Sequence, residues 1–183
     1  MNTEKNNMTF IIQKPFYYIR HGETDWNVQR ITMGSTDIPL NARGIEQAHQ
    51  AAELLCHTHI ESIAASPLRR AVQTAEIIAQ IVQKPITIID DLRECSFGVM
   101  EGKPKGDEVW LREWRDGAVI EGAELFSSFA QRVASGINQA TELPGPVLVV
   151  AHGGVYRVIQ KSLNLPVQGL PNCTLVYHEP SAK

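Results

Sequence analysis

The sequence predicts an α/β protein with three layers, α/β/α, in which helices cover both faces of a mostly parallel central sheet. Two observations lead to this prediction. Short runs of β-branched and aromatic residues alternate along the chain with longer segments in which apolar residues recur every three or four positions. Two of the short runs, 16–19 and 147–151, show no polar alternation, which is typical of strands buried on both faces of a parallel sheet.

The length of 183 residues favours one folded domain. Residues 1–14 carry three Asn and two Lys and end before Pro15, so we expect an N-terminal extension there and the domain over residues 15–183. Within the extension, Phe10–Ile12 is a candidate edge strand.

In the first half of the domain, strands and helices are expected to alternate. In chain order they are the strand 16–19, the helix 40–57, the strand 60–65, the helix 68–82 and the strand 86–89. Asn41 is the expected cap of the first helix. Ser66 and Pro67 are expected to begin the second helix, as its cap and its first helical residue.

The second half begins with an irregular stretch, 90–122, which contains glycines, charges and a short helical pattern at 109–114. The clearest helix of the chain follows, because Phe129, Val133 and Ile137 repeat at helical spacing. The remaining expected elements are this helix over 125–143, the strand 147–151, the helix 155–163 and the strand 175–177.

Composition and charge argue against several classes of protein. Seventeen Lys and Arg against 20 Asp and Glu give a net charge of −3, so no overall positive field attracts a polyanion and we expect no nucleic acid partner. The longest aliphatic stretch, 147–151, is far shorter than the roughly 20 residues of a transmembrane helix, so we expect no membrane partner. The odd, scattered set Cys56, Cys95 and Cys173 forms no disulfide or metal-binding pattern, which favours the reducing cytoplasm.

Chemistry is expected where the predicted strands end, since ligands of open α/β sheets bind beyond the carboxyl ends of the strands. Two strands lead directly into His-Gly sequences, at His21 and His152. Arg20 ends the first strand, Arg70 follows the second and Glu94 follows the third. These side chains are therefore expected at one edge of the sheet.

This set of residues suits phosphoryl transfer. A neutral imidazole such as that of His21 is a competent nucleophile, provided that its other nitrogen keeps a proton on an acceptor such as a backbone carbonyl. The guanidinium groups of Arg20 and Arg70 match the three equatorial oxygens of a transferring phosphoryl group. A carboxylic acid such as Glu94 protonates the departing alkoxide and later deprotonates water.

Five blocks of the sequence resemble the histidine phosphatase superfamily, which includes the cofactor-dependent phosphoglycerate mutases. They are RHGETDWN at 20–27, SPLRRAVQTAEI at 66–77, LRE at 92–94, EGAE at 121–124 and VVAHGG at 149–154. The blocks occur in the family's order and span about residues 16 to 178, so the resemblance implies a phosphoglycerate mutase-like fold for the whole domain.

The resemblance also implies roles for individual residues. His21 would be the residue phosphorylated, Glu94 the proton donor, and His152 a second histidine of the catalytic site. The phosphate pocket would be formed by Arg20, Asn27, Arg70 and His152. Arg70 is preferred to Arg69 because the family's arginine directly precedes the alanine matched here by Ala71. Members of the family need no metal, so we expect neither a metal nor another cofactor.

Two positions depart from the family pattern and are expected at the outer rim of the pocket. They are Met33-Gly34, where the family often has Gln-Gly, and Met100-Glu101-Gly102, which lacks a preceding Trp. The segment between Glu94 and Leu125 is also shorter than the insertion that retains the intermediate in mutases of the superfamily. This shortness favours hydrolysis.

The sequence therefore predicts a phosphomonoesterase that hydrolyses a small phosphorylated metabolite through a phosphohistidine on His21. The rival is a mutase-type phosphotransferase, followed by a non-catalytic module that binds a phosphorylated ligand and by a metal-dependent hydrolase using His21, His152 and Asp90. Asp90, Asp91 and Glu101 compete with Glu94 for the acid role, and Cys95 is interpreted as a bystander. The substrate and the oligomeric state stay open.

Overall fold

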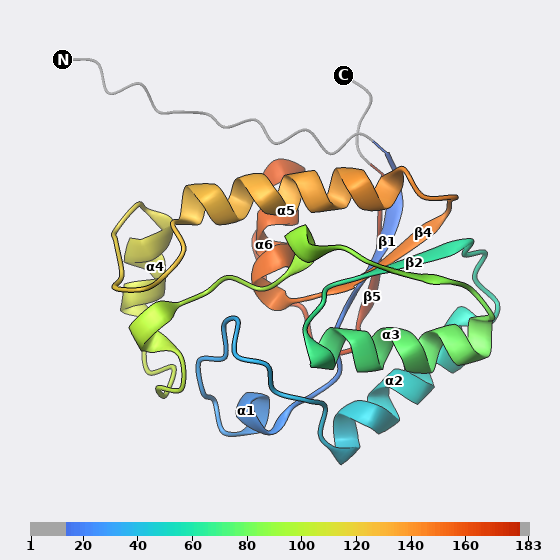
Figure 1. Ribbon diagram of the computed structural model, residues 1–183, viewed down its shortest axis with the longest axis horizontal. Helices are drawn as coiled ribbons and strands as arrows, with labels where there is room; N and C mark the ends of the chain where they lie inside the picture. Colours follow the sequence, from blue (N-terminus) through green and yellow to red (C-terminus); the bar gives the residue numbers. More distant parts are fainter. Residues whose placement is uncertain (1–13, 180–183) are drawn as a thin grey trace.

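The computed structural model describes residues 14–179, which form one five-stranded sheet with helices on both faces (Figure 1). The strands are β1 (Phe16–Arg20), β2 (Ser62–Ala65), β3 (Ile86–Ile88), β4 (Val147–Ala151) and β5 (Leu175–His178). Their order across the sheet is β3-β2-β4-β1-β5, and β5 alone runs antiparallel to its neighbour. The candidate edge strand Phe10–Ile12 lies outside the described residues.

The register of the two inner strands brings their carboxyl ends together. Arg20, the last residue of β1, pairs with Ala151, the last residue of β4. The backbone N–H of His21 continues this ladder by donating to the carbonyl of Ala151 at 2.9 Å. The residues that directly follow β1 and β4, His21 and His152, are therefore neighbours at one edge of the sheet.

Helices α5 (Phe126–Thr141) and α6 (Gly153–Ser162) cover one face of the sheet, and α2 (Ala42–Leu55) and α3 (Arg69–Val82) cover the other (Figure 1). Alternate residues of β4 point to opposite layers: Val149 packs with the α5 and α6 cluster, and Val150 with the α2 and α3 cluster. The predicted three-layer α/β/α class and mostly parallel sheet are therefore confirmed.

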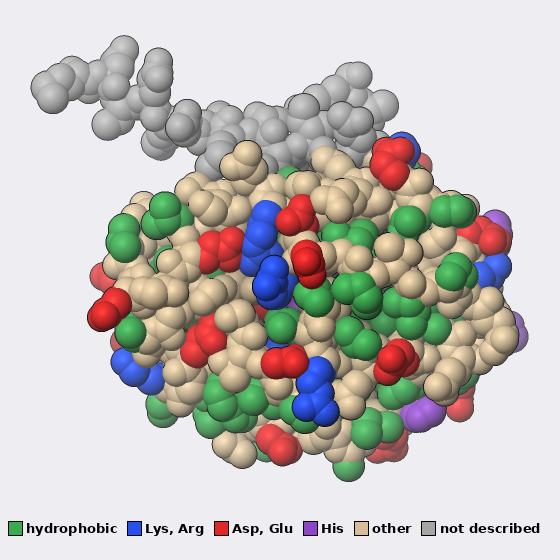
Figure 2. Space-filling model, viewed as in Figure 1, with side chains coloured by type: hydrophobic (Ala, Val, Ile, Leu, Met, Phe, Trp, Pro, Cys, Tyr) green, Lys and Arg blue, Asp and Glu red, His purple; other side chains and the backbone are tan. Residues whose placement is uncertain are grey.

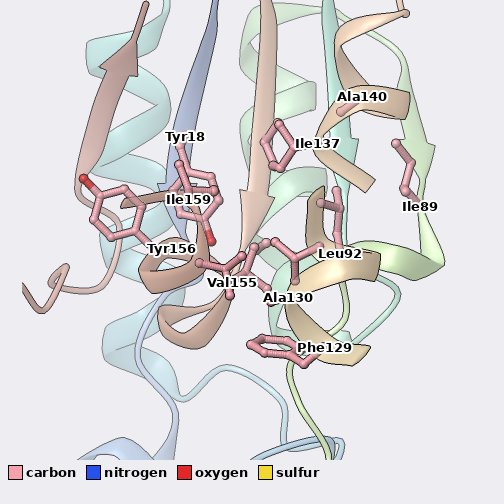
Figure 3. Close-up of a cluster of buried hydrophobic side chains, with 14 of the residues drawn as sticks. Tyr18, Ile89, Leu92, Phe129, Ala130, Ile137, Ala140, Val155, Tyr156 and Ile159 are labelled. Atoms are coloured by element: carbon pink, nitrogen blue, oxygen red, sulfur yellow. The ribbon is translucent and has the colours of Figure 1, made fainter. Parts of the chain in front are cut away.

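The core between the sheet and α5 and α6 supports the edge that carries the two histidines. Figure 3 shows Ile137 and Phe129 of α5 and Val155 of α6 packed beside Tyr18 of β1. The buried hydroxyl of Tyr18 donates a 2.6 Å hydrogen bond to the backbone carbonyl of His152. This bond ties the first residue after β4 to the core.

The irregular stretch of the sequence folds into short elements beside the sheet edge. They are the 3₁₀ turns Asp90–Leu92 and Gly98–Met100 and the helix α4 (Val109–Arg115), while α1 (Asp25–Val28) follows β1. α4 lies next to the start of α5 (Figure 1), where the Trp114 indole donates to the carbonyl of Glu124 at 2.8 Å. The sequence predicted only the helical pattern at 109–114.

The predicted start of the 68–82 helix was wrong in its details. Helix α3 begins at Arg69, and Leu68, not Ser66, is its N-cap residue. Ser66 is fully buried because its hydroxyl contacts the ring of His152 instead of capping a helix. By contrast, Asn41 caps α2 as expected, accepting from the N–H of Gly44 at 2.8 Å.

Two glycines fix the approach of α2 to the end of β1. A Cβ at Gly22 would lie 2.4 Å from the carbonyl oxygen of Gly44, and a Cβ at Gly44 would lie 2.1 Å from that of Glu23. Both contacts are with backbone atoms, which cannot rotate away. The start of α2 therefore packs directly against the loop that follows the first strand.

The surface of the described residues carries mixed charges. Figure 2 shows Lys and Arg side chains interspersed with Asp and Glu on one face, without a continuous basic stripe there. No helix within residues 14–179 is long and apolar enough to cross a membrane.

Candidate active site

A cavity of about 380 Å³ opens at the carboxyl ends of the strands. Of the residues selected from the sequence, five line it: Arg20, His21, Asn27, Arg70 and Glu94. The sixth, His152, is fully buried behind the cavity, with its ring centroid 5.2 Å from that of His21. The structure thus brings all six residues together.

The His21 ring is held in one tautomer. Its Nδ1 lies 2.7 Å from the carbonyl oxygen of Gly22, and because a carbonyl only accepts, Nδ1 carries the proton and donates it. Burial lowers the pKa of His21, and the positive charges of Arg70 and Arg20 lower it further. His21 is therefore neutral, and its Nε2 keeps a free lone pair.

His152 is fixed by a residue that the sequence analysis had assigned another role. Its Nε2 lies 2.6 Å from the hydroxyl of Ser66, whereas its Nδ1 is buried without a partner among the described residues. Burial lowers the pKa of His152, followed by the charge of Arg70. Ser66 directly follows β2, so the strand-end rule that selected His152 also selects Ser66 once the two strands are known to be adjacent.

Two buried guanidinium groups face the cavity with unused donors. Arg70 donates from Nη1 to the carbonyl of Thr36 and from Nη2 to that of Gly34, both at 2.8 Å. Arg20 donates from Nη1 to the carbonyl of Leu170 at 2.8 Å. The Nε–H of each arginine is buried and has no partner within residues 14–179.

The two guanidinium groups stay charged although they are buried. Burial lowers the pKa of Arg70 to about 10 and lowers that of Arg20, while the carboxylate of Glu94 opposes both shifts. Arg20, His21, Arg70 and His152 form what we call the cationic cup. An oxyanion fits it, because a phosphate accepts charge-assisted hydrogen bonds from such forks.

Asn27 adds neutral donors to the same cavity. Its side-chain oxygen is engaged by the backbone N–H of Thr24 at 3.2 Å and by the amide of Asn172 at 3.4 Å. This arrangement leaves the amide N–H groups of Asn27 for a ligand. The same Asn172 amide donates to the backbone carbonyl of His21 at 2.8 Å and so steadies the loop.

Glu94 is anchored at the start of α6. One carboxylate oxygen accepts from the N–H of Gly154 at 2.8 Å, and the other accepts from the N–H of Cys95 at 3.1 Å. A Cβ at Gly154 would lie 2.3 Å from this carboxylate, so the close approach requires glycine. Glu94 therefore lies beside the cup with a defined orientation.

Arg132 of α5 holds the loop that carries Glu94, a role that the sequence analysis missed. Its guanidinium donates to the carbonyls of Asp91, Arg93 and Glu94 at 3.0, 2.6 and 3.2 Å. It also forms a bidentate ion pair with Glu124, with both bonds at 2.8 Å. Glu124 lies in the EGAE block, which was the available signal for this clamp.

Glu101 supports the cup from outside the cavity. It accepts from the N–H groups of Ser35 and Phe97 at 2.9 Å each, and so holds the loop whose carbonyls bind Arg70. Of the expected rim residues, Met33 and Gly34 do line the cavity, but Met100, Glu101 and Gly102 do not. The prediction for the second set was wrong because the carboxylate of Glu101 turns toward the neighbouring loop.

The competing residues do not meet at the cup. Asp90 and Asp91 are absent from the lining of the cavity, and Asp91 accepts from Gln139 at 2.7 Å. Burial raises the pKa of the Cys95 thiol, the opposite of what a thiolate nucleophile needs. Within residues 14–179 no group of three or more His, Cys, Asp or Glu is placed to hold a metal ion.

The sequence over residues 16–180 matches the family model described as "Histidine phosphatase superfamily (branch 1)". The chain belongs to the histidine phosphatase superfamily. It is 36% identical over 143 residues to "Uncharacterized phosphatase PhoE" of Bacillus subtilis (strain 168), covering 77% of this chain and 72% of that protein. It is 35% identical over 175 residues to "Probable phosphoglycerate mutase GpmB" of Proteus mirabilis (strain HI4320), covering 87% of this chain and 81% of that protein.

Solved structures of histidine phosphatases share the fold. The alpha-ribazole phosphatase from Shigella flexneri superposes with a TM-score of 0.77 at 29% identity, covering 89% of each chain. The phosphoglycerate mutase-like fold expected from the sequence is therefore confirmed. Phosphatases and phosphoglycerate mutases of the histidine phosphatase superfamily are both among the relatives of this chain.

Proposed function

We propose that the protein is a phosphomonoesterase that hydrolyses a small phosphorylated metabolite through a phosphohistidine on His21. One observation carries the proposal: the neutral His21 ring, with its Nδ1 proton on the carbonyl of Gly22, lies among two buried arginines whose Nε–H groups have no partner in the described residues. The arrangement supports an oxyanion placed against a free imidazole nitrogen.

In the first displacement, Nε2 of His21 attacks phosphorus and the bond from phosphorus to the ester oxygen breaks. The negative charge on the three equatorial oxygens is stabilised by Arg20, Arg70, His152 and Asn27. Protonated Glu94 transfers its proton to the departing alkoxide, which leaves as an alcohol. The products of this step are phosphohistidine and a Glu94 carboxylate.

In the second displacement, Glu94 removes a proton from a water molecule, whose oxygen attacks the phosphohistidine. The bond from phosphorus to Nε2 breaks and inorganic phosphate leaves, so His21 and Glu94 return to their starting states. The anchoring of Glu94 by the N–H groups of Gly154 and Cys95 supports this double role, since the carboxylate stays in place between the two steps.

The proposal is tested by rapid-quench labelling with a ³²P-labelled phosphomonoester. Wild-type protein is expected to carry acid-labile, base-stable label, and His21→Ala is expected to abolish both the label and turnover. His49→Ala is the matched control because His49 is exposed on α2. Label that persists in His21→Ala, or that maps to another residue, would overturn the proposal.

A second candidate is phosphoryl transfer to another hydroxyl, favoured by the 35% identity to "Probable phosphoglycerate mutase GpmB". The short segment between Glu94 and α5 supports hydrolysis instead. An assay with 3-phosphoglycerate, with and without a bisphosphate primer, separates the two candidates. Isomerisation that depends on the primer identifies a mutase, whereas release of inorganic phosphate identifies a hydrolase.

A further inference from the structure

The cavity continues beyond the cationic cup to a second set of cations. Lys105, Arg115 and Arg157 all line it and all are half-buried. They come from three elements: the segment before α4, the end of α4 and the middle of α6. We call these three residues the second cationic group.

The second cationic group has no counterion in the described part of the chain. The ion pairs within residues 14–179 join Lys14 to Glu142, His59 and Lys84 to Glu61, and Arg132 to Glu124. No carboxylate oxygen therefore lies within 4.0 Å of a side-chain nitrogen of Lys105, Arg115 or Arg157. This contrasts with Arg132, whose charge is fully paired.

The three charges are close enough to repel one another. Burial lowers the pKa of Lys105, and although Glu108 opposes this shift, Arg20 and Arg157 add to it. Burial also lowers the pKa of Arg115, and the charge of Arg157 lowers it further. Such repulsion destabilises the unliganded cavity, and an anion bound between the cations relieves it.

The second cationic group lies about one helical turn from the cup. A Cβ at Gly153 would lie 3.7 Å from Nε of Arg20, so the first turn of α6 contacts the cup. Arg157 follows four residues later on the same face of α6, a rise of about 6 Å. Lys161, one turn further on, lies over the ring of Phe126 at 4.7 Å and is already engaged.

The charge of the whole cavity exceeds what one phosphate group requires. Its described lining contains seven Lys and Arg side chains but only three carboxylates, in a chain whose net charge is −3. A phosphomonoester dianion bound in the cup is matched by Arg20 and Arg70. Aromatic side chains of Phe97, Trp110 and Trp114 line the same cavity and exclude water, which strengthens the remaining field.

We propose that the second cationic group is a binding subsite for an anion on the leaving group of the substrate. The preferred substrate is then a phosphomonoester whose alcohol carries a carboxylate or a second phosphate, about one helical turn from the transferred phosphate. This inference rests on the proposed function, because it assigns the substrate class of the same cavity.

The test compares substrates that differ only in the second charge. The carboxylate arm pairs 3-phosphoglycerate with glycerol 3-phosphate, and the phosphate arm pairs 1,3-propanediol bisphosphate with 3-hydroxypropyl phosphate. For wild-type protein we expect the charged member of at least one pair to have a kcat/KM at least tenfold above that of its partner. The arm with the larger ratio identifies the second anion.

Variants then assign the ratio to the second cationic group. Arg157→Gln and Lys105→Gln each remove one cation from a different element and are expected to lower the ratio at least fivefold. Arg157→Lys is expected to retain most of it, which excludes a folding defect as the cause. Arg43→Gln is the matched control: it changes the net charge equally, but Arg43 is exposed on α2 and does not line the cavity.

The outcomes separate this inference from the proposed function. Hydrolysis of all four substrates with ratios near one, or ratios that survive both Gln variants, overturns the inference and leaves the phosphomonoesterase standing. A ratio that falls equally in Arg43→Gln also overturns it, since a general charge effect would then explain the preference. Absence of hydrolysis and labelling with every substrate overturns the proposed function and the inference together.

Discussion

Replacing Ser66 by alanine isolates the contact that holds the second histidine. Ser66 and His152 are both fully buried, and the serine hydroxyl is the only partner of the imidazole ring within residues 14–179, at 2.6 Å. Ser66→Ala leaves both ring nitrogens buried and unpaired, which is expected to lower the free energy of unfolding by about 1–3 kcal/mol. Because the freed ring no longer faces the phosphate in one orientation, kcat/KM is expected to fall roughly 10- to 100-fold.

The assay combines urea unfolding with steady-state hydrolysis of p-nitrophenyl phosphate. Ser128→Ala is the control, because Ser128 is exposed on α5 and its loss is expected to change neither quantity. A double-mutant cycle adds His152→Ala: if Ser66 acts through the imidazole, its replacement has little further effect on kcat/KM in that background. Equal losses in both backgrounds, or wild-type values in Ser66→Ala, would refute the reasoning.

Three further predictions concern the same site. Because burial lowers the pKa values of His21 and His152, the unfolded state binds more protons below about pH 6.5; the free energy of unfolding should then fall with decreasing pH, by up to about 1.4 kcal/mol per pH unit for each histidine. Denaturant titrations should show a flatter profile for His21→Gln. Gly154→Ala places a methyl group against the Glu94 carboxylate and should lower kcat at least tenfold, whereas Gly153→Ala, with 3.7 Å of clearance, should cost less. Glu94→Gln should slow alkyl phosphates at least tenfold more than p-nitrophenyl phosphate, since phenolic leaving groups need little protonation.

Each of these predictions has a contrary result. A pH profile of unfolding that is identical in wild type and His21→Gln would show that the histidine is not neutral in the folded state. Equal kcat values for Gly154→Ala and Gly153→Ala would show that the position of Glu94 is not critical. Equal losses of Glu94→Gln on alkyl and phenolic substrates would remove its role as proton donor.

Sequence reasoning succeeded where a residue's role follows from its position at the end of a strand. His21 and His152 directly follow two buried apolar runs, and parallel strands end at one edge of a sheet, so their proximity follows from the α/β pattern. The helix α5 was equally accessible, because its apolar spacing reflects one buried face.

The partners of these residues were not accessible in the same way. Ser66-Pro67 reads locally as a helix start, and only the adjacency of β2 and β4 shows that the hydroxyl faces His152. Arg132 lies 38 positions from Glu94 on a helix whose pattern reveals burial but no ligand. Lys105 lies in an irregular segment, where no periodicity fixes the direction of a side chain.

The separation of the two imidazoles is set by the sheet itself. Both rings belong to the first residue after an inner strand, and their centroid distance of 5.2 Å is close to the roughly 4.8 Å spacing of neighbouring strands. Inserting a single residue into β1 or β4 would turn one imidazole toward the opposite layer and dismantle the pair, whatever the surrounding side chains. Changes in the outer helices and in the segment around Lys105 alter what the cavity admits while this gap stays constant, so selectivity and the reacting pair are free to diversify separately.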